Sequence, residues 1–116
     1  MLTLRFRADQ QKLRLLDPVR SIASGTVNYV HAEFDLGENW TEFDVVQTAW
    51  SRGIKKAFAD LDDHNHCAVP ADIIDDLGTV KVNIIGIVIG ENGKRIEQLT
   101  TFPVVAVAVT GKAMLG

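Results

Sequence analysis

The sequence predicts an all-β fold, a two-sheet β-sandwich of about seven to nine mainly antiparallel strands with one short helical turn. In most segments apolar residues alternate with polar ones, which places every second side chain on one face of a strand. Such segments recur at intervals of roughly ten residues, with turn-forming residues between them. Strands do not alternate with long helical segments, so a parallel α/β sheet is disfavoured.

Length and composition are those of one ordinary globular domain. The chain has 116 residues, of which 47% are hydrophobic and 23% are charged. This composition supplies enough apolar side chains for an independent core and lies far from that of a disordered chain. We therefore expect a single β-sandwich domain over residues 1–116.

Two short strands are expected at the N-terminus. Apolar residues recur at period two in Leu2–Phe6 and again in Leu13–Leu15, just before Pro18. A proline removes a backbone donor and fixes φ, so it marks the end of this region. In each segment the alternation places alternate side chains on one face of a strand.

The next two strands carry aromatic residues. Thr26–Asp35 alternates up to Phe34 and stops at the turn Leu36–Asn39. Asp44–Arg52 alternates in the same way and places Val46, Thr48 and Trp50 on one face, with Val45, Gln47 and Ala49 on the other. Both segments are typical of half-buried strands.

The middle of the chain is less regular. Ile54–Ala59 is a plausible strand, although its alanines and lysines leave a helix as the main rival. Leu61–Asn65 is a polar loop, and Cys67–Pro70 is extended because the residue before proline avoids the helical region. Ala71–Leu77 predicts one or two helical turns, with Gly78 available as a left-handed terminator.

The C-terminal third predicts the centre of the sheet. Thr79–Ile89 is rich in β-branched residues, which suit the pleated surface of a central strand. The turn Gly90–Lys94 contains an Asn-Gly pair, which supplies the positive φ values that hairpin turns demand. Arg95–Leu99 then returns along the hairpin, and Thr101–Thr110 closes the sheet.

Charge and hydropathy exclude two classes of partner. The net charge of −3 and the pI near 5.5 lack the basic excess that phosphate-backbone binding requires, so no nucleic acid is expected. The longest apolar stretches, Ile84–Ile89 and Val104–Val109, are far shorter than the roughly 20 residues of a membrane-spanning helix. No membrane partner is expected.

The N-terminal sequence and the cysteine content fit a protein made in a bacterial cytoplasm. The first residues alternate apolar and polar side chains, unlike the continuous apolar core of a signal peptide, so no export is indicated. The single cysteine, Cys67, has no intramolecular disulfide partner. A reducing compartment is therefore compatible with folding.

The segment Asp62–Cys67 concentrates potential metal ligands. His64, His66 and Cys67 could contribute to a zinc site if a fourth ligand came from elsewhere. Their spacing matches no standard zinc motif, so a solvated polar loop followed by a small buried thiol is favoured. We expect no bound metal, and a metal-dependent enzyme is the least favoured hypothesis.

We predict no catalytic and no cofactor-binding residues. Asp72, Asp75 and Asp76 favour a solvated helix face, because acid–base catalysis needs a carboxyl group whose pKa is shifted by its surroundings. The glycines of Gly86–Gly93 lie within and after a strand, with no long helix N-terminus to receive phosphate. The chain is therefore not expected to be an enzyme.

Three aromatic residues, Tyr29, Trp40 and Trp50, are candidates for a carbohydrate-stacking platform. Their rings offer large apolar faces with polar groups at the edge, which suits contact with a sugar ring. At strand-compatible positions such rings more often belong to the core. The core position is favoured, and the glycan platform is kept as the alternative.

The order of several motifs resembles that of a known family. Tyr29–Phe34 (YVHAEF), followed by Trp40 and then by Val46–Trp50 (VQTAW), resembles the N-terminal domain of phage baseplate upper proteins and related tail-fibre proteins of phages that infect Gram-positive hosts. The similarity spans about residues 26–109. Further segments follow the same order, namely Cys67–Pro70 (CAVP), Leu77–Thr79 (LGT), Val80–Gly86 (VKVNIIG) and Leu99–Pro103 (LTTFP).

The resemblance implies an Ig-like β-sandwich that commonly begins a longer protein and attaches it to the virion. No catalytic residues accompany this domain, so none are carried over. The implied function is that of a virion structural protein, an adaptor in the tail, baseplate or fibre that docks onto other phage structural proteins. A homo-oligomer is compatible with this role. The alternative is a carbohydrate-binding module that recognises host cell-wall glycan through Tyr29, Trp40 and Trp50.

Overall fold

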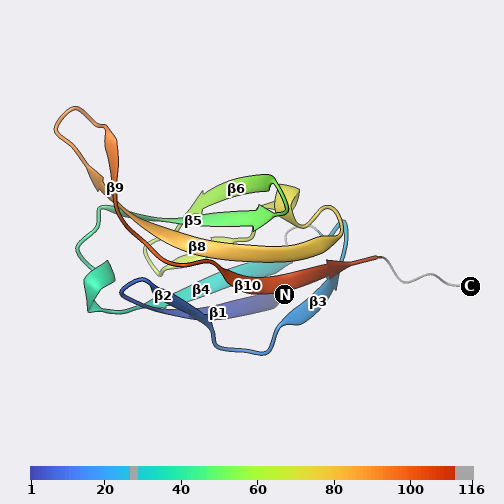
Figure 1. Cartoon of the computed structure of the whole chain (residues 1–116). Helices are drawn as coiled ribbons and strands as arrows, with labels where there is room; N and C mark the ends of the chain where they lie inside the picture. The colour runs from blue at the N-terminus through green and yellow to red at the C-terminus, as the bar shows by residue number, and fades with distance from the viewer. Residues whose placement is uncertain (27–28, 112–116) are drawn as a thin grey trace, which may run out of the picture.

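The computed structural model describes residues 1–26 and 29–111, which form two β-sheets packed against each other (Figure 1). Two short 3-10 helices lie between strands. The elements are β1 (Leu2–Asp9), β2 (Lys12–Leu15), β3 (Arg20–Ala23), β4 (Val30–Leu36), η1 (Glu38–Trp40), β5 (Val45–Arg52), β6 (Lys55–Asp60), β7 (His66–Ala68), η2 (Ala71–Ile73), β8 (Gly78–Ile89), β9 (Arg95–Thr100) and β10 (Val104–Thr110). The predicted all-β sandwich is confirmed.

The two sheets differ in size. One sheet has the order β2-β1-β4-β7, and the other has the order β3-β10-β8-β5-β6, with β9 also paired to β8. The pairs β1–β4 and β3–β10 are parallel, and every other pair in the described residues is antiparallel, as predicted for most of the fold. Strand β8 pairs with β5 along one edge and with β10 and then β9 along the other. This strand is therefore the centre of the larger sheet.

An aromatic contact joins the two sheets across the core. Phe6 of β1 stacks on Phe34 of β4 with ring centroids 4.8 Å apart, and Trp50 of β5 meets Phe6 edge-on at 6.4 Å. The indole N–H of Trp50 donates a hydrogen bond to the hydroxyl of Thr48 at 2.7 Å, and that hydroxyl donates to the carbonyl of Ala59. The polar atoms that this packing buries are thus satisfied.

The helical segment predicted over Ala71–Leu77 is shorter than expected. Only Ala71–Ile73 forms a 3-10 turn. The neighbours Ile73 and Ile74 are both buried in the core, and a segment this short has no stable helix of its own, so core packing sets its conformation. Gly78 does not terminate a helix but begins β8, with φ at 141°.

Two further strand predictions need adjustment. Arg20–Ala23 forms β3, which the sequence did not indicate because only Ile22 in it is a large apolar residue. His66–Ala68 forms the short strand β7, where only an extended segment was predicted, so the described residues contain ten strands and not the seven to nine expected. The strand expected from Thr26 begins at Val30, and the Val27 part of that prediction lies outside the described residues. The strand prediction for Ile54–Ala59 is confirmed by β6, and the rival helix is wrong.

The hairpin between β8 and β9 is confirmed, with a different turn from the one expected. Gly93 has φ at 78°, whereas Asn92 does not take a positive φ. The amide of Gly93 donates to the carbonyl of Gly90, and the amide of Gly90 donates to the carbonyl of Lys94. This is the three-residue connection in which a type I turn is followed by a left-handed residue. Asn92 instead accepts a hydrogen bond from the amide of Lys94 at 3.2 Å.

Substitution of Gly93 by valine is expected to destabilise this hairpin by more than about 1 kcal/mol, because a β-branched residue resists positive φ. A Cβ at Gly93 would meet no heavy atom within 4 Å, so backbone strain alone causes the loss. Urea denaturation and amide hydrogen exchange of Arg95–Leu99 measure it. Glu91→Val in the same turn is the control, and equal exchange rates in the two variants would contradict the turn assignment.

Candidate functional site

The three aromatic candidates do not lie on one exposed face. Trp40 and Trp50 are each 1% exposed, whereas Tyr29, just before β4, is 47% exposed. The indole of Trp40 packs on Phe43 at 5.6 Å and donates a hydrogen bond to the carbonyl of Gln10 at 2.8 Å. Both indoles therefore belong to the core. A glycan platform built from these three rings is not formed, because two of them fill the interior.

The three candidate metal ligands, His64, His66 and Cys67, each make contacts with other residues and do not converge on one point. The rings of His64 and His66 lie 6.2 Å apart, and His66 Nε2 lies 3.6 Å from a carboxylate oxygen of Glu33. Cys67 Sγ lies 3.7 Å from the hydroxyl of Thr48 on the core side of β7. Within residues 1–26 and 29–111, no group of three or more His, Cys, Asp and Glu side chains is placed to hold a metal ion.

The thiol of Cys67 is the small, largely buried group that the sequence indicated. Burial raises the pKa of Cys67 to about 11, partly opposed by the hydrogen bond with Thr48. At neutral pH the thiol therefore stays protonated, and a protonated thiol is a poor nucleophile and a poor metal ligand. Its role in the described contacts is packing between β7 and β5.

The aspartates after η2 hold the β5–β6 hairpin in place. Asp75 accepts a hydrogen bond from Arg52 at 3.0 Å and another from Lys55 at 3.3 Å. These two cations, Arg52 foremost, lower the pKa of Asp75. Asp76 accepts from the amide of Leu77, so it supports the local turn. Both carboxylates thus have structural partners on the surface of the fold.

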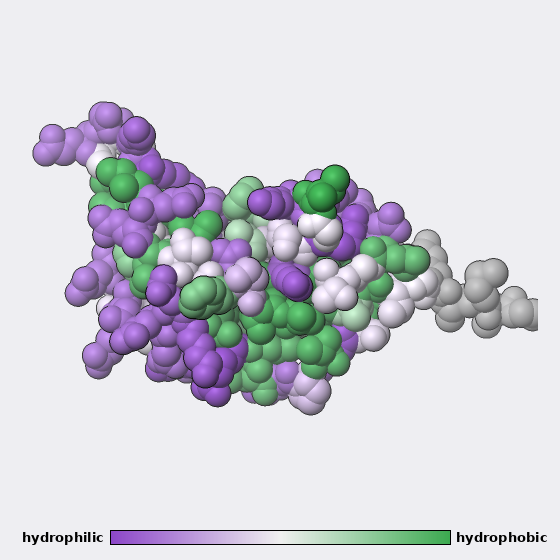
Figure 2. Space-filling view, in the orientation of Figure 1, coloured by the Kyte–Doolittle hydropathy of each residue, from purple (hydrophilic) through white to green (hydrophobic). Residues whose placement is uncertain are grey.

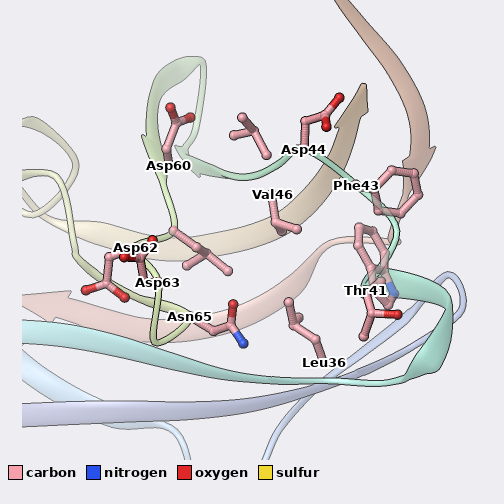
Figure 3. Close-up of a pocket in the computed structure, with 12 residues that line it drawn as sticks. Leu36, Thr41, Phe43, Asp44, Val46, Asp60, Asp62, Asp63 and Asn65 are labelled. Carbon is pink, nitrogen blue, oxygen red and sulfur yellow. The ribbon is translucent and has the colours of Figure 1, made fainter. Parts of the chain in front are cut away.

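A pocket of about 430 Å³ opens near the loop before β5 and the loop after β6 (Figure 3). Its wall has an apolar part, which consists of Leu36, Trp40, Phe43, Val45, Val46 and Leu61. Four carboxylates lie around this apolar part, namely Asp44, Asp60, Asp62 and Asp63. The pocket therefore combines apolar surface with negative charge, although most of these carboxylates already have partners.

Hydrogen bonds within the fold occupy three of those carboxylates. Asp44 accepts from the amide of Ile89 at 2.7 Å, and Asp60 forms an ion pair with Arg95 at 3.0 Å. Asp62 accepts from the amides of His66 and His64, and these two bonds lower its pKa. They order the loop before β7 and the base of the β8–β9 hairpin. Three of the four carboxylates around the pocket therefore have structural roles.

The β8–β9 hairpin is the part of the fold that extends beyond the body of the sandwich (Figure 1). Ile89 is 45% exposed and Ile96 is 46% exposed, so apolar side chains of this arm are open to solvent. Within residues 1–26 and 29–111, strand β9 pairs only with β8, and no other strand of these residues pairs with its outer edge along Arg95–Gln98. The ion pair between Arg95 and Asp60 ties the arm to β6.

Apolar surface also gathers on the body of the molecule. Figure 2 shows a hydrophobic area in the lower middle of the view, where Figure 1 draws β10 and β3, away from the hairpin arm. Leu16 and Val19, in the segment between β2 and β3, are about half exposed, and Phe102 before β10 is 72% exposed. Single exposed apolar side chains are normal on protein surfaces, so these three residues alone assign no binding role to this area.

The sequence matches no family model, and it has no significant match among curated proteins. Among the described residues, no helix is long and apolar enough to cross a membrane.

The sequence predicted the β8–β9 hairpin but not that the outer edge of β9 would be free. The available signal was the order Arg95-Ile96-Glu97, in which opposite charges share one face of a strand and flank an apolar residue.

Proposed function

We propose that the chain is a structural protein of a bacteriophage particle, an Ig-like adaptor module of the tail, baseplate or fibre that docks onto neighbouring virion subunits. The observation that carries this proposal is the β8–β9 arm, which reaches beyond the sandwich with an unpaired strand edge and exposed Ile89 and Ile96. Unpaired strand edges bind other chains by adding a strand, with main-chain hydrogen bonds supplying the affinity.

The assignment to a virion rests on the resemblance to the N-terminal domain of baseplate upper proteins. The motifs of that resemblance fall mainly on strands of the sandwich body: Tyr29–Phe34 at the start of β4, with Tyr29 just before it, Val46–Trp50 on β5, and Val80–Gly86 on β8. Residues of these segments, including Phe34, Trp50 and Val82, are buried. The shared motifs thus support a shared core, on which a projecting arm adapts the module to its neighbours.

The body of the fold suits a rigid adaptor. Backbone hydrogen bonds hold each sheet, and the Phe6–Phe34–Trp50 contact joins the two sheets through the interior. Ion pairs fix the connections at the surface, among them Arg5–Asp17 at 2.7 Å and Arg52–Asp75 at 3.0 Å. A rigid body with one extended arm is the geometry that positions neighbouring subunits.

The test is the presence of this chain in assembled particles. Particles from the host that carries the gene are purified through a density gradient and analysed by quantitative mass spectrometry, and the chain is then co-expressed with the products of adjacent genes. We expect a fixed copy number per particle and a co-purifying complex with at least one adjacent product. Absence from gradient-purified particles, with the chain abundant in the unassembled fraction, would overturn the virion assignment.

A glycan array distinguishes the adaptor from the carbohydrate-binding alternative. Because Trp40 and Trp50 are buried, the adaptor proposal expects no binding of host cell-wall polysaccharide by the isolated chain. Saturable binding that Tyr29→Ala removes would favour the carbohydrate-binding module instead.

A further inference from the structure

We infer that the free edge of β9 binds the same edge of a second copy of this chain, in an antiparallel pairing centred on Ile96. This inference deepens the proposed docking role, because it names the partner of the arm. It rests on three features of the segment Arg95–Gln98: which backbone groups face outward, which charges lie opposite each other, and which side chains are left exposed.

The hydrogen-bond pattern of the hairpin decides which backbone groups face outward. The amide of Gly90 donates to the carbonyl of Lys94, and the amide of Thr101 donates to the carbonyl of Ile84. Since hydrogen-bonded and non-hydrogen-bonded pairs alternate in an antiparallel ladder, Ile96 directs its N–H and C=O toward Val88. Arg95 and Glu97 therefore direct their N–H and C=O groups away from β8.

These outward groups are self-complementary about a twofold axis. When Ile96 of one copy lies opposite Ile96 of the second copy, Arg95 of each lies opposite Glu97 of the other. The outward N–H and C=O groups of these two residues then exchange hydrogen bonds, and Ile96 occupies the non-hydrogen-bonded pair between them. An isologous contact of this kind closes on itself and gives a dimer, not a fibre.

The side chains agree with this register. Arg95 and Glu97 are two residues apart, so they share one face of β9, and each meets an opposite charge on the second copy. On the other face, Ile96 is 46% exposed in the single chain and contacts its counterpart in the dimer. Asp60 accepts from the two terminal nitrogens of Arg95, and this ion pair holds the guanidinium on the face where Glu97 of the second copy arrives.

The position of the arm leaves room for the second copy. Figure 1 shows the β8–β9 hairpin leaving the body of the sandwich, so an added strand does not have to enter between the two sheets. Nearer the body, the amide of Phe102 donates to the carbonyl of Gln11, and the β1–β2 turn thus lies beside the end of β9. The accessible edge is therefore limited to Arg95–Gln98.

The test is the association of the full chain in solution, measured by sedimentation equilibrium over a range of concentrations. We expect the average mass to rise from 12.7 kDa toward twice that value as the concentration increases. Glu97→Arg, which places like charges opposite each other twice, is expected to weaken association about tenfold or more. Asp72→Arg, a change of the same charge at η2 near the opposite end of β5, is the control and is expected to associate normally.

A mixing experiment separates this register from other contacts. Arg95→Glu alone is expected to lose association, because two acidic residues then lie opposite each other. An equimolar mixture of Glu97→Arg and Arg95→Glu is expected to form a heterodimer, since every facing pair is again of opposite charge. Wild-type protein that stays monomeric, a Glu97→Arg variant that associates normally, or a folded mixture that does not associate would each overturn the inference.

Amide hydrogen exchange supplies a readout that does not depend on substitutions. The amides of Arg95 and Glu97 are expected to exchange more slowly as protein concentration rises, whereas the amide of Ile96, bonded within the hairpin, is expected to change little. If the exchange rates of the Arg95 and Glu97 amides did not change with protein concentration, pairing at this edge would be wrong. A negative result in these association experiments would not affect the test for the chain in purified particles, so the dimer and the virion assignment are tested separately.

Discussion

Replacement of Trp50 by alanine is expected to lower the free energy of unfolding by about 3–5 kcal/mol. The indole is almost wholly buried, meets Phe6 across the two sheets and donates a hydrogen bond to Thr48. Its loss removes buried apolar area and leaves a cavity that a sandwich interior cannot easily close. Guanidinium denaturation followed by circular dichroism measures the change. Circular dichroism is preferred to tryptophan fluorescence because the variant lacks Trp50 and the remaining Trp40 lies in a different part of the core.

A matched control for Trp50→Ala is Ile54→Ala. Ile54 lies in the turn between β5 and β6, close to Trp50 in sequence, and its side chain is fully exposed. We expect this change to alter the free energy of unfolding by less than about 0.5 kcal/mol. If both variants unfolded at the same denaturant concentration as the wild type, the placement of Trp50 between the sheets would be wrong.

Replacement of Gly86 by valine is expected to destabilise the fold by about 1–3 kcal/mol through overpacking. Gly86 lies in β8 with its inner face against Phe43, and a Cβ built there would stand 2.5 Å from two atoms of that ring. The ring cannot easily withdraw, because it packs on the buried indole of Trp40. The midpoint of urea denaturation measures the loss.

A double-mutant cycle tests the cause assigned to Gly86→Val. Phe43→Ala removes the ring that the new side chain would strike, so the double variant is expected to lose less stability than the sum of the two single variants. Gly111→Val is the control, since a Cβ at Gly111 meets nothing within 4 Å. Strict additivity in the cycle would show that Phe43 is not the obstacle.

The sequence predicted most strands correctly because a strand with one buried face shows a local alternation of apolar and polar residues. In β8 the residues Val80, Val82 and Ile84 recur at period two, and all three are buried on the inner face. The hairpin at Gly93 was equally readable, since the conformation it needs favours glycine. Where this alternation is weak, as in β3 with Ile22 as its single large apolar residue, the prediction failed.

The candidate site was less predictable, because it depends on which strands become neighbours. Tyr29, Trp40 and Trp50 have similar chemistry in the sequence, yet the fold buries two of them and exposes the third. The ion pair between Asp60 and Arg95 joins residues 35 positions apart, and it forms because the fold places the end of β6 and the start of β9 within reach of each other in the same sheet.

By itself, then, the sequence determined the strand periodicity, the turn at Gly93 and the apolar residues available for the core. The tertiary structure alone decided that β3 runs parallel to β10, that Tyr29 stays exposed while both tryptophans are buried as the sequence favoured, and that β9 has one edge unpaired among the described strands. The physical reason is that alternation specifies which side of a strand is buried, whereas backbone hydrogen bonds accept any partner strand. The choice among partners comes from the packing of the two sheets together, which involves residues far apart in the chain.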